Sequence, residues 1–235
     1  MAIVTTDNKH YSDIASAIRS KNGTETQYKP SEMAEAIASM QTGDSYYDAF
    51  WDKYQNNGQP ANYQYAFGRN RFDDSNYNPK YPIVPNSENG AGNYIFYGSN
   101  ITDTKVPIDL TGVTKDSGAS GMLYYCYYLK TVNKIIVNEP SPNITVYECT
   151  QLRNVTIEGS FARNFDIGGC TVLKRNSILS IYNSLSANAT GKTCTFSQTA
   201  VNKAFETSTG AKDGSTSAEW EAMKAAKSNW TFALA

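Results

Sequence analysis

The sequence has little of what several large classes of protein require. His10 is the only histidine among 235 residues, which excludes a zinc site built from several histidines. No apolar run approaches the roughly 20 residues of a membrane-spanning helix, and the first residues do not resemble a secretory leader. The 21 basic and 22 acidic residues nearly cancel, so no excess of positive charge attracts nucleic acid or an anionic membrane. From these absences we expect a soluble protein made in the cytosol, with no nucleic-acid partner and no membrane insertion.

Catalytic and metal-binding motifs are missing as well. The chain has no phosphate-binding glycine loop, no H-E-x-x-H motif and no C-x-x-C pair. The adjacent carboxylates Asp73 and Asp74 stand in a segment without the glycine and glutamate of a calcium-binding loop. We therefore expect no enzyme, no cofactor and no metal site. A glycosidase carboxylate pair assembled from distant positions is the alternative that the sequence leaves open.

Tyrosine, by contrast, is abundant: the chain has 17 tyrosines but 9 phenylalanines and 3 tryptophans. The densest group is Tyr124, Tyr125, Tyr127 and Tyr128, on either side of Cys126. In a strand or a corner, alternate members of such a group face outward. A tyrosine ring stacks well on a sugar and adds a hydroxyl group. These four residues are the candidate ligand surface, with a host-surface glycan as the expected ligand and packing inside the protein as the alternative role.

Four cysteines recur at intervals of 21 to 24 residues: Cys126, Cys149, Cys170 and Cys194. Each of the first three begins a Cys-x-x-Leu motif, and an upstream copy starting at Gly98 has glycine in place of cysteine. A small residue followed by an aliphatic residue suits a tight corner in a stack of repeats. The short β-branched segments 134–137 and 154–157 predict one strand in each repeat.

We expect these cysteines to be reduced and buried, with disulfides as the alternative. Serine in place of Cys149 is then expected to cost more stability than alanine, because it would bury an unpaired hydroxyl. The pattern over residues 66–181 resembles the irregular leucine-rich repeats of the BspA-like type, which occur in bacterial surface proteins and in phages of gut bacteria. The resemblance implies a solenoid of short parallel strands.

The N-terminal segment predicts a helical hairpin. Ser12 is the expected cap of a first helix that ends at residues 21–23, and Pro30 begins a second helix. The segments DIASAIR (13–19) and KPSEMAEAI (29–37) resemble a small module at the N-termini of phage tail and virion proteins. The resemblance implies attachment to other virion proteins. The apolar residues expected to carry it are Ile14, Ile18, Met33, Ile37 and Met40.

Helices are expected at both ends of the repeats. Tyr47, Phe50, Trp51 and Tyr54 form an aromatic stripe at helical spacing, which would cover the first repeat. Toward the C-terminus, three helices are expected to be capped by Ser177, by Ser197 and by a capping box at residues 216–219. Residues 230–234 alternate like a strand.

The fold class that follows is α+β: an irregular leucine-rich-repeat solenoid with an N-terminal helical hairpin and a helical C-terminal cap. Its expected parts are a helical anchor module (1–42), an aromatic capping helix (43–65), the repeat body (66–178) and the C-terminal cap (179–235).

The expected function is a structural component of a tailed-bacteriophage virion, in the tail, baseplate or fibre, that assists host attachment. By the same resemblance we expect a homo-oligomer, with a trimer as the first expectation. The alternative is a bacterial cell-surface leucine-rich-repeat adhesin.

Overall fold

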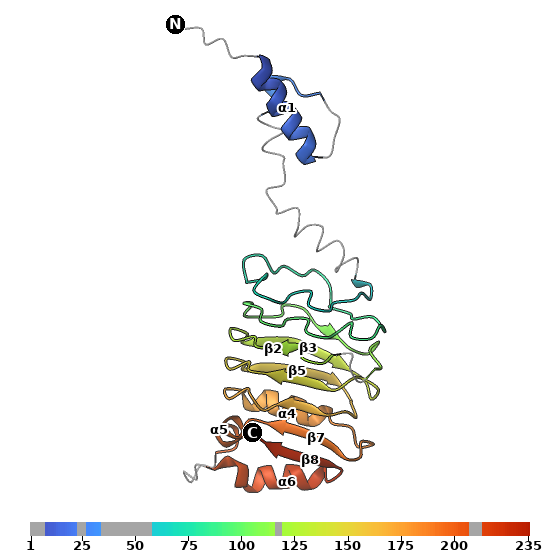
Figure 1. Cartoon of the computed structure of the whole chain (residues 1–235). Coiled ribbons are helices and arrows are strands. Elements are labelled where there is room, and N and C mark those ends of the chain that lie inside the picture. Colours follow the sequence, from blue (N-terminus) through green and yellow to red (C-terminus); the bar gives the residue numbers. More distant parts are fainter. Residues whose placement is uncertain (1–7, 23–26, 34–57, 116–118, 207–212) are drawn as a thin grey trace. The chain divides into compact units, whose positions relative to one another are not determined.

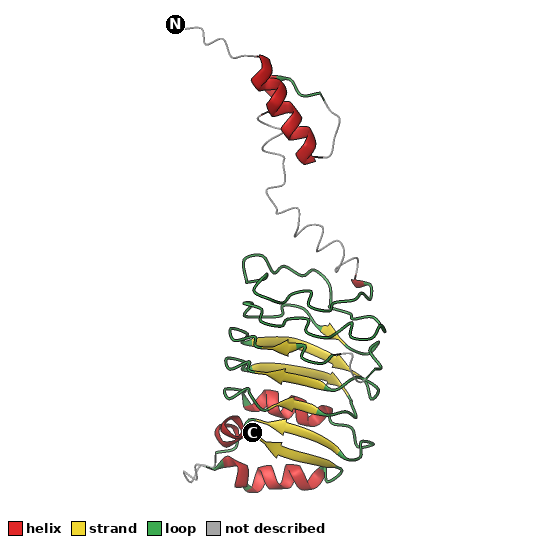
Figure 2. Ribbon diagram, viewed as in Figure 1, coloured by secondary structure: helices red, strands yellow, loops and turns green. Residues whose placement is uncertain are grey.

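The computed structural model describes residues 8–22, 27–33, 58–115, 119–206 and 213–235. The chain divides into two compact units, Met1–Phe50 and Trp51–Ala235. The fold is α+β, with parallel sheets (Figures 1 and 2). Its elements are α1 (Asn8–Asn22), β1 (Ile108–Asp109), β2 (Leu123–Tyr124), β3 (Thr131–Val137), β4 (Ile144–Tyr147), β5 (Asn154–Gly159), β6 (Phe165–Ile167), α4 (Arg175–Ser184), β7 (Lys192–Phe196), α5 (Gln198–Ala204), η2 (Gly214–Thr216), α6 (Ala218–Ala226) and β8 (Trp230–Leu234).

The N-terminal unit is a helical pair with its own small core. Ala15 and Ile18 of α1 are buried with Met33, which lies in a helical segment at 30–33. The main-chain N–H of Lys29 donates to the Glu32 carboxylate at 2.9 Å, which caps the start of that segment. The first predicted helix is thus present, and the described part of the second, residues 30–33, is helical.

The predicted start of α1 at Ser12 is wrong, because the helix already begins at Asn8. Tyr11 packs against the Ala15 and Ile18 core, so the apolar stripe already includes the residue before Ser12. Ile14 lies off this stripe and is 42% exposed.

The body unit alternates between two parallel sheets along the chain. One sheet has the order β1-β3-β5 and the other β2-β4-β6-β7-β8. Leu123 pairs with Val146 and Thr131 with Asn154, each 23 positions later, as Cys149 follows Cys126. The spacing of Cys126 and Cys149 therefore equals the step from β2 to β4 and from β3 to β5. The two strands predicted near 134–137 and 154–157 are confirmed as β3 and β5.

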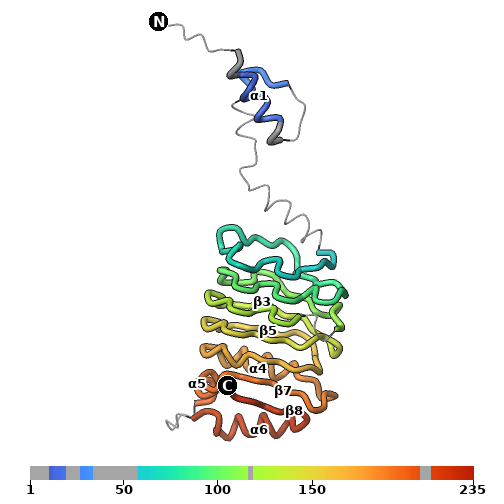
Figure 3. The backbone as a smooth tube through the Cα atoms, in the orientation of Figure 1, coloured from blue at the N-terminus to red at the C-terminus, as the bar shows by residue number. Residues whose placement is uncertain are grey.

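The core lies between the two sheets. Along the strands, inward residues alternate with outward ones, as in the buried Ile144 and Val146 of β4 beside the exposed Tyr147. Toward the lower residue numbers of the body the core becomes aromatic: the rings of Phe67 and Phe96 stack with centroids 5.1 Å apart. We call each run of the backbone through the two sheets a pass. Successive passes are clearest in the tube drawing (Figure 3).

The sheet that contains β5 ends at α4, and serine hydroxyls make the junction. Ser177 Oγ accepts from the Val155 N–H at 2.9 Å, and Ser180 Oγ accepts from the Ile157 N–H at 2.8 Å. The prediction that Ser177 caps the helix is wrong: α4 begins at Arg175, and the residue before it makes no side-chain cap. The Ser177 hydroxyl instead accepts a hydrogen bond from an N–H of β5, the edge strand. In a larger sheet, a carbonyl of the next strand would accept that hydrogen bond.

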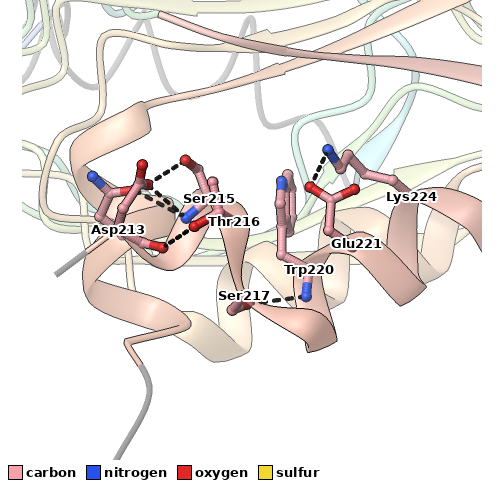
Figure 4. Close-up of polar contacts among 8 residues, drawn as sticks. Asp213, Ser215, Thr216, Ser217, Trp220, Glu221 and Lys224 are labelled. Carbon is pink, nitrogen blue, oxygen red and sulfur yellow. Dashed lines mark hydrogen bonds and ion pairs between the residues drawn. The ribbon is translucent and has the colours of Figure 1, made fainter. Parts of the chain in front are cut away.

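The C-terminal helices are capped by serines. Ser197 accepts from the Ala200 N–H at the start of α5, as predicted. At α6 the cap is Ser217, whose Oγ accepts from the Trp220 N–H at 3.1 Å (Figure 4). The capping box predicted at residues 216–219 is therefore wrong: the cap lies one residue later, at Ser217, and Glu219 pairs with Arg175 instead. The predicted strand at 230–234 is confirmed as β8.

The predicted aromatic stripe at residues 47–54 lies outside the described residues.

Candidate functional site

The most distinctive surface of the body is a cluster of tyrosine rings from successive passes of the chain. Neighbouring rings lie with centroids 4.9 to 6.1 Å apart, within the range of aromatic pairing. We call this set the tyrosine cluster: Tyr65, Tyr94, Tyr97, Tyr124, Tyr125, Tyr127 and Tyr147.

Backbone register stacks the first pair. The N–H of Tyr65 donates to the Asn93 carbonyl, and the N–H of Tyr94 donates to the Ser120 carbonyl. Tyr65 and Tyr94 both have a left-handed backbone, with φ of 56° and 55°, so they project their side chains alike. Their rings stack at 4.9 Å with an interplanar angle of 9°.

Glycine makes room for the next position of this column. Gly121 has a left-handed backbone with φ 62°, close to the φ of Tyr65 and Tyr94. A Cβ atom there would lie 2.5 Å from Cε1 of Tyr94. The absence of a side chain at Gly121 therefore allows the Tyr94 ring to lie against the next pass of the chain.

A second column is set by the pairing of β2 with β4. Tyr124 and Tyr147 are register partners, and their rings are 5.6 Å apart. Tyr125 meets Tyr147 edge to face at 5.6 Å and Tyr97 at 5.5 Å. Tyr94, Tyr97, Tyr124 and Tyr125 contact rings from neighbouring passes, so the ring contacts join the cluster into one continuous surface.

The cluster is partly exposed and uncharged at neutral pH. Tyr127 is 48% exposed and Tyr147 45%, while the other members are half-buried. Desolvation, with the neighbouring tyrosines, raises the pKa of Tyr125, so its hydroxyl stays protonated. At one end the Arg69 guanidinium lies 4.9 Å from the centre of the Tyr65 ring. The surface offers aromatic edges and faces together with hydroxyl donors and acceptors.

The structure unites three of the four predicted ligand residues. Tyr124, Tyr125 and Tyr127 belong to the cluster, whereas Tyr128, 53% exposed, makes no ring contact within the part of the chain described. The sequence-based selection missed Tyr147, although it stands two positions before Cys149 as Tyr124 stands two before Cys126. Tyr94 and Tyr97 were missed because no cysteine marks their pass.

All four cysteines are free and buried. They are more than small apolar residues: the Cys126 thiol donates to the Phe96 carbonyl and the Cys149 thiol to the Leu123 carbonyl, each at 2.9 Å. Both acceptors belong to the preceding pass of the chain. The thiols thus link successive passes. Burial raises the pKa of the Cys126, Cys170 and Cys194 thiols well above the ordinary value, which keeps them protonated.

The candidate anchoring residues fall into different positions. Ile18 and Met33 are buried in the core of the helical pair, whereas Ile14 is exposed. Ile37 and Met40 lie outside the described residues. Of the described candidates, only Ile14 presents an apolar side chain to the surroundings.

Among the described residues, no three His, Cys, Asp or Glu side chains gather closely enough to hold a metal ion. In the same residues no helix has the length and apolar character needed to cross a bilayer. Comparison of the chain with protein-family models, with curated proteins and with solved structures finds no match.

Proposed function

We propose that this chain is a structural component of a tailed-bacteriophage virion, located in the tail, baseplate or fibre. In this proposal the N-terminal unit attaches the protein to other virion proteins, and the body is displayed outward to assist attachment to the host surface. The body is further proposed to be an irregular leucine-rich-repeat solenoid of the BspA-like type.

The observation that carries this proposal is the arrangement of the body around a repeated step. Parallel register, the Cys-x-x-Leu corners and the tyrosine cluster all recur from one pass of the chain to the next. Repeats of this kind build an extended surface by adding similar units, and extended surfaces suit recognition of long ligands. A surface of aromatic rings with hydroxyl groups fits the stacking of sugar rings, so a host-surface glycan is the proposed ligand.

The division of the chain into two compact units supports a separate attachment role for the first one. Its own core is small, with Ala15, Ile18 and Met33 as the buried members. Ile14 stays 42% exposed on α1 and is the side chain proposed to contact a virion partner.

Incorporation into particles tests this role. A chain beginning at Ser45 is expected to fold and remain soluble but to be lost from particles. Ile14→Asn is expected to reduce incorporation while α1 stays folded, because Ile14 lies outside the helical core. Asp13→Asn, at the neighbouring exposed position, is the matched control. Normal incorporation of the shortened chain would refute the attachment role.

Assembly is proposed to be homo-oligomeric, with a trimer as the expected state. Arraying several copies would strengthen weak glycan contacts through avidity. Light scattering of the intact chain tests this directly. A monomer would show that any multivalency comes from the particle rather than from self-association.

A further inference from the structure

A column of like charges runs across the body at the corners formed by Cys-x-x-Leu. In three successive passes a cation directly follows the buried leucine: Lys130 after Leu129, Arg153 after Leu152 and Lys174 after Leu173. The backbone holds them in line, because the Arg153 N–H donates to the Lys130 carbonyl and the Lys174 N–H to the Arg153 carbonyl, each at 2.9 Å. We call Lys130, Arg153 and Lys174 the cation column.

None of the three side chains forms an ion pair with a described carboxylate. All are exposed, and no ion pair or side-chain hydrogen bond involves them within the described parts of the chain. Two cations close in sequence differ: Lys134 pairs with Glu158, and Arg175 with Glu219. The first turn of α4, directly after Lys174, contains no acidic residue either.

Such an arrangement is unfavourable for the protein alone. The backbone hydrogen bonds place the three residues side by side, so their like charges share one part of the surface and repel one another. A chain with a net charge of −1 has enough carboxylates to neutralise three cations, yet none of the described ones does so. An anionic ligand with regularly spaced charges would remove this repulsion.

We propose that the cation column binds an acidic polysaccharide, an inference that rests on the host-attachment role proposed above and specifies its ligand. The spacing of the column is close to the length that one sugar ring adds to an extended chain. The neighbouring exposed positions carry hydroxyl and amide groups, among them Thr150, Gln151 and Thr171, which suit sugar hydroxyls. Tyr127 and Tyr128 stand in the first of these corners and connect the column to the tyrosine cluster.

The same positions argue against a single-stranded nucleic acid. Binding of that kind uses aromatic rings at successive steps, on which bases stack. Here Tyr128 is followed in the next two passes by Gln151 and Val172, so the rings beside the column do not continue. A near-neutral chain also lacks the broad positive field that nucleic-acid binding uses.

The test uses the full chain and three probes: polygalacturonate as the acidic polysaccharide, dextran as a neutral one and polythymidylate as a nucleic acid. The chain is expected to bind polygalacturonate more tightly than the other two, with an affinity that falls as salt rises. Salt-independent binding, or polythymidylate bound as tightly as polygalacturonate, would overturn the proposal.

Two triple variants with the same change in net charge locate the site. Replacing the column by glutamine (K130Q, R153Q and K174Q) is expected to weaken polygalacturonate binding about tenfold, from three surface charge pairs. The control K80Q, K115Q and K203Q removes three exposed lysines elsewhere and is expected to change it less than twofold. An equal loss in both variants, or no loss in the first, would refute the column as the site.

Folding and the wider proposal are checked separately. The column variant should unfold at the same temperature as the parent chain or a higher one in low salt, because a repulsion has been removed. If it unfolds earlier, the single variant Arg153→Gln replaces it and should still weaken binding. Both measurements use purified protein, so failure here leaves virion incorporation intact, whereas absence from virions would refute only the proposed function.

Discussion

At the scale of single residues, the cysteines show how a small side chain can both pack and link. Cys149 is fully buried, and its thiol donates to the Leu123 carbonyl at 2.9 Å. The sequence suggests an unpaired hydroxyl if serine replaces it, but the structure provides an acceptor. The expected order of the two substitutions is therefore reversed.

Cys149→Ala should lower the free energy of unfolding by about 1–2 kcal/mol, through the lost hydrogen bond and a small void. Cys149→Ser should cost less, because its hydroxyl can still donate to Leu123. Urea denaturation of the two variants measures the order. A serine variant clearly less stable than the alanine variant would mean that the hydroxyl finds no acceptor.

Gly159 is a second residue whose identity the backbone dictates. It ends β5 with φ 101°, and a Cβ atom there would lie 2.0 Å from the Val137 carbonyl oxygen of β3. Gly159→Ala should therefore lower the free energy of unfolding by more than about 2 kcal/mol, from strain and a steric clash together.

Gly191→Ala is the matched control. Gly191 also has a positive φ, of 61°, but nothing lies within 4 Å of the added atom. It should show the cost of backbone strain alone, about 1 kcal/mol. Equal losses at the two glycines would show that β3 can move away from the added methyl group at Val137 without loss of stability.

At the scale of elements, α4 covers the edge of the sheet at β5, where main-chain N–H groups would otherwise lack acceptors. Its serines accept from the Val155 and Ile157 N–H groups. Removing both hydroxyls (S177A and S180A) should lower the free energy of unfolding by about 2–4 kcal/mol, because two main-chain donors lose their acceptors. Chemical denaturation measures this.

The control pair is Asn176→Ala and Asn183→Ala, which changes exposed polar residues of the same helix. It should be nearly neutral, within about 0.5 kcal/mol. If the double serine variant also leaves the free energy of unfolding unchanged, water or a shifted backbone must accept from the Val155 and Ile157 N–H groups. The serines of α4 would then not be needed at the edge of β5.

The same helix shows where reasoning from sequence stops. Strands β3 and β5 are predictable because both are short segments rich in β-branched residues. The first turn of α4 was misassigned because Ser177 fits the local rule for a cap, while its actual partner, Val155, is 22 positions away. A hydrogen bond chosen by tertiary contact leaves no local signal.

The candidate site was predictable to a similar degree. Tyr124 and Tyr147 share a fixed offset from cysteines, and the cation column has a fixed offset from leucines, so both patterns are present in the sequence. Tyr65 and Tyr94 are aligned by left-handed residues in passes of a different length. Their stacking depends on register, which composition and spacing do not reveal.

At the scale of the whole molecule, buried ionisable groups should make stability depend on alkaline pH. Burial raises the pKa of Cys126, Cys170, Cys194 and Tyr77 well above their ordinary values of 9.0 and 10.0. Above pH 9 the unfolded chain releases these protons while the folded chain keeps them, so the free energy of unfolding should fall as pH rises. Below about pH 8 both states keep these protons, so these groups should add almost no pH dependence.

Urea denaturation between pH 8 and 10.5, with a reducing agent present, measures this fall. Each group adds at most about 1.4 kcal/mol per pH unit once its unfolded form is ionised. The Cys194→Ala variant should show a shallower fall than the parent chain. Stability that is constant up to pH 10.5 would mean that the thiols ionise in the folded protein.

The central claim, a place in the virion, is tested most directly by mass spectrometry of purified phage particles from cells that express this gene. The account predicts peptides of both the N-terminal unit and the body in the particles, in a constant ratio to the other tail proteins after repeated purification. Peptides found only in the bacterial cell-wall fraction, and absent from the particles, would contradict it.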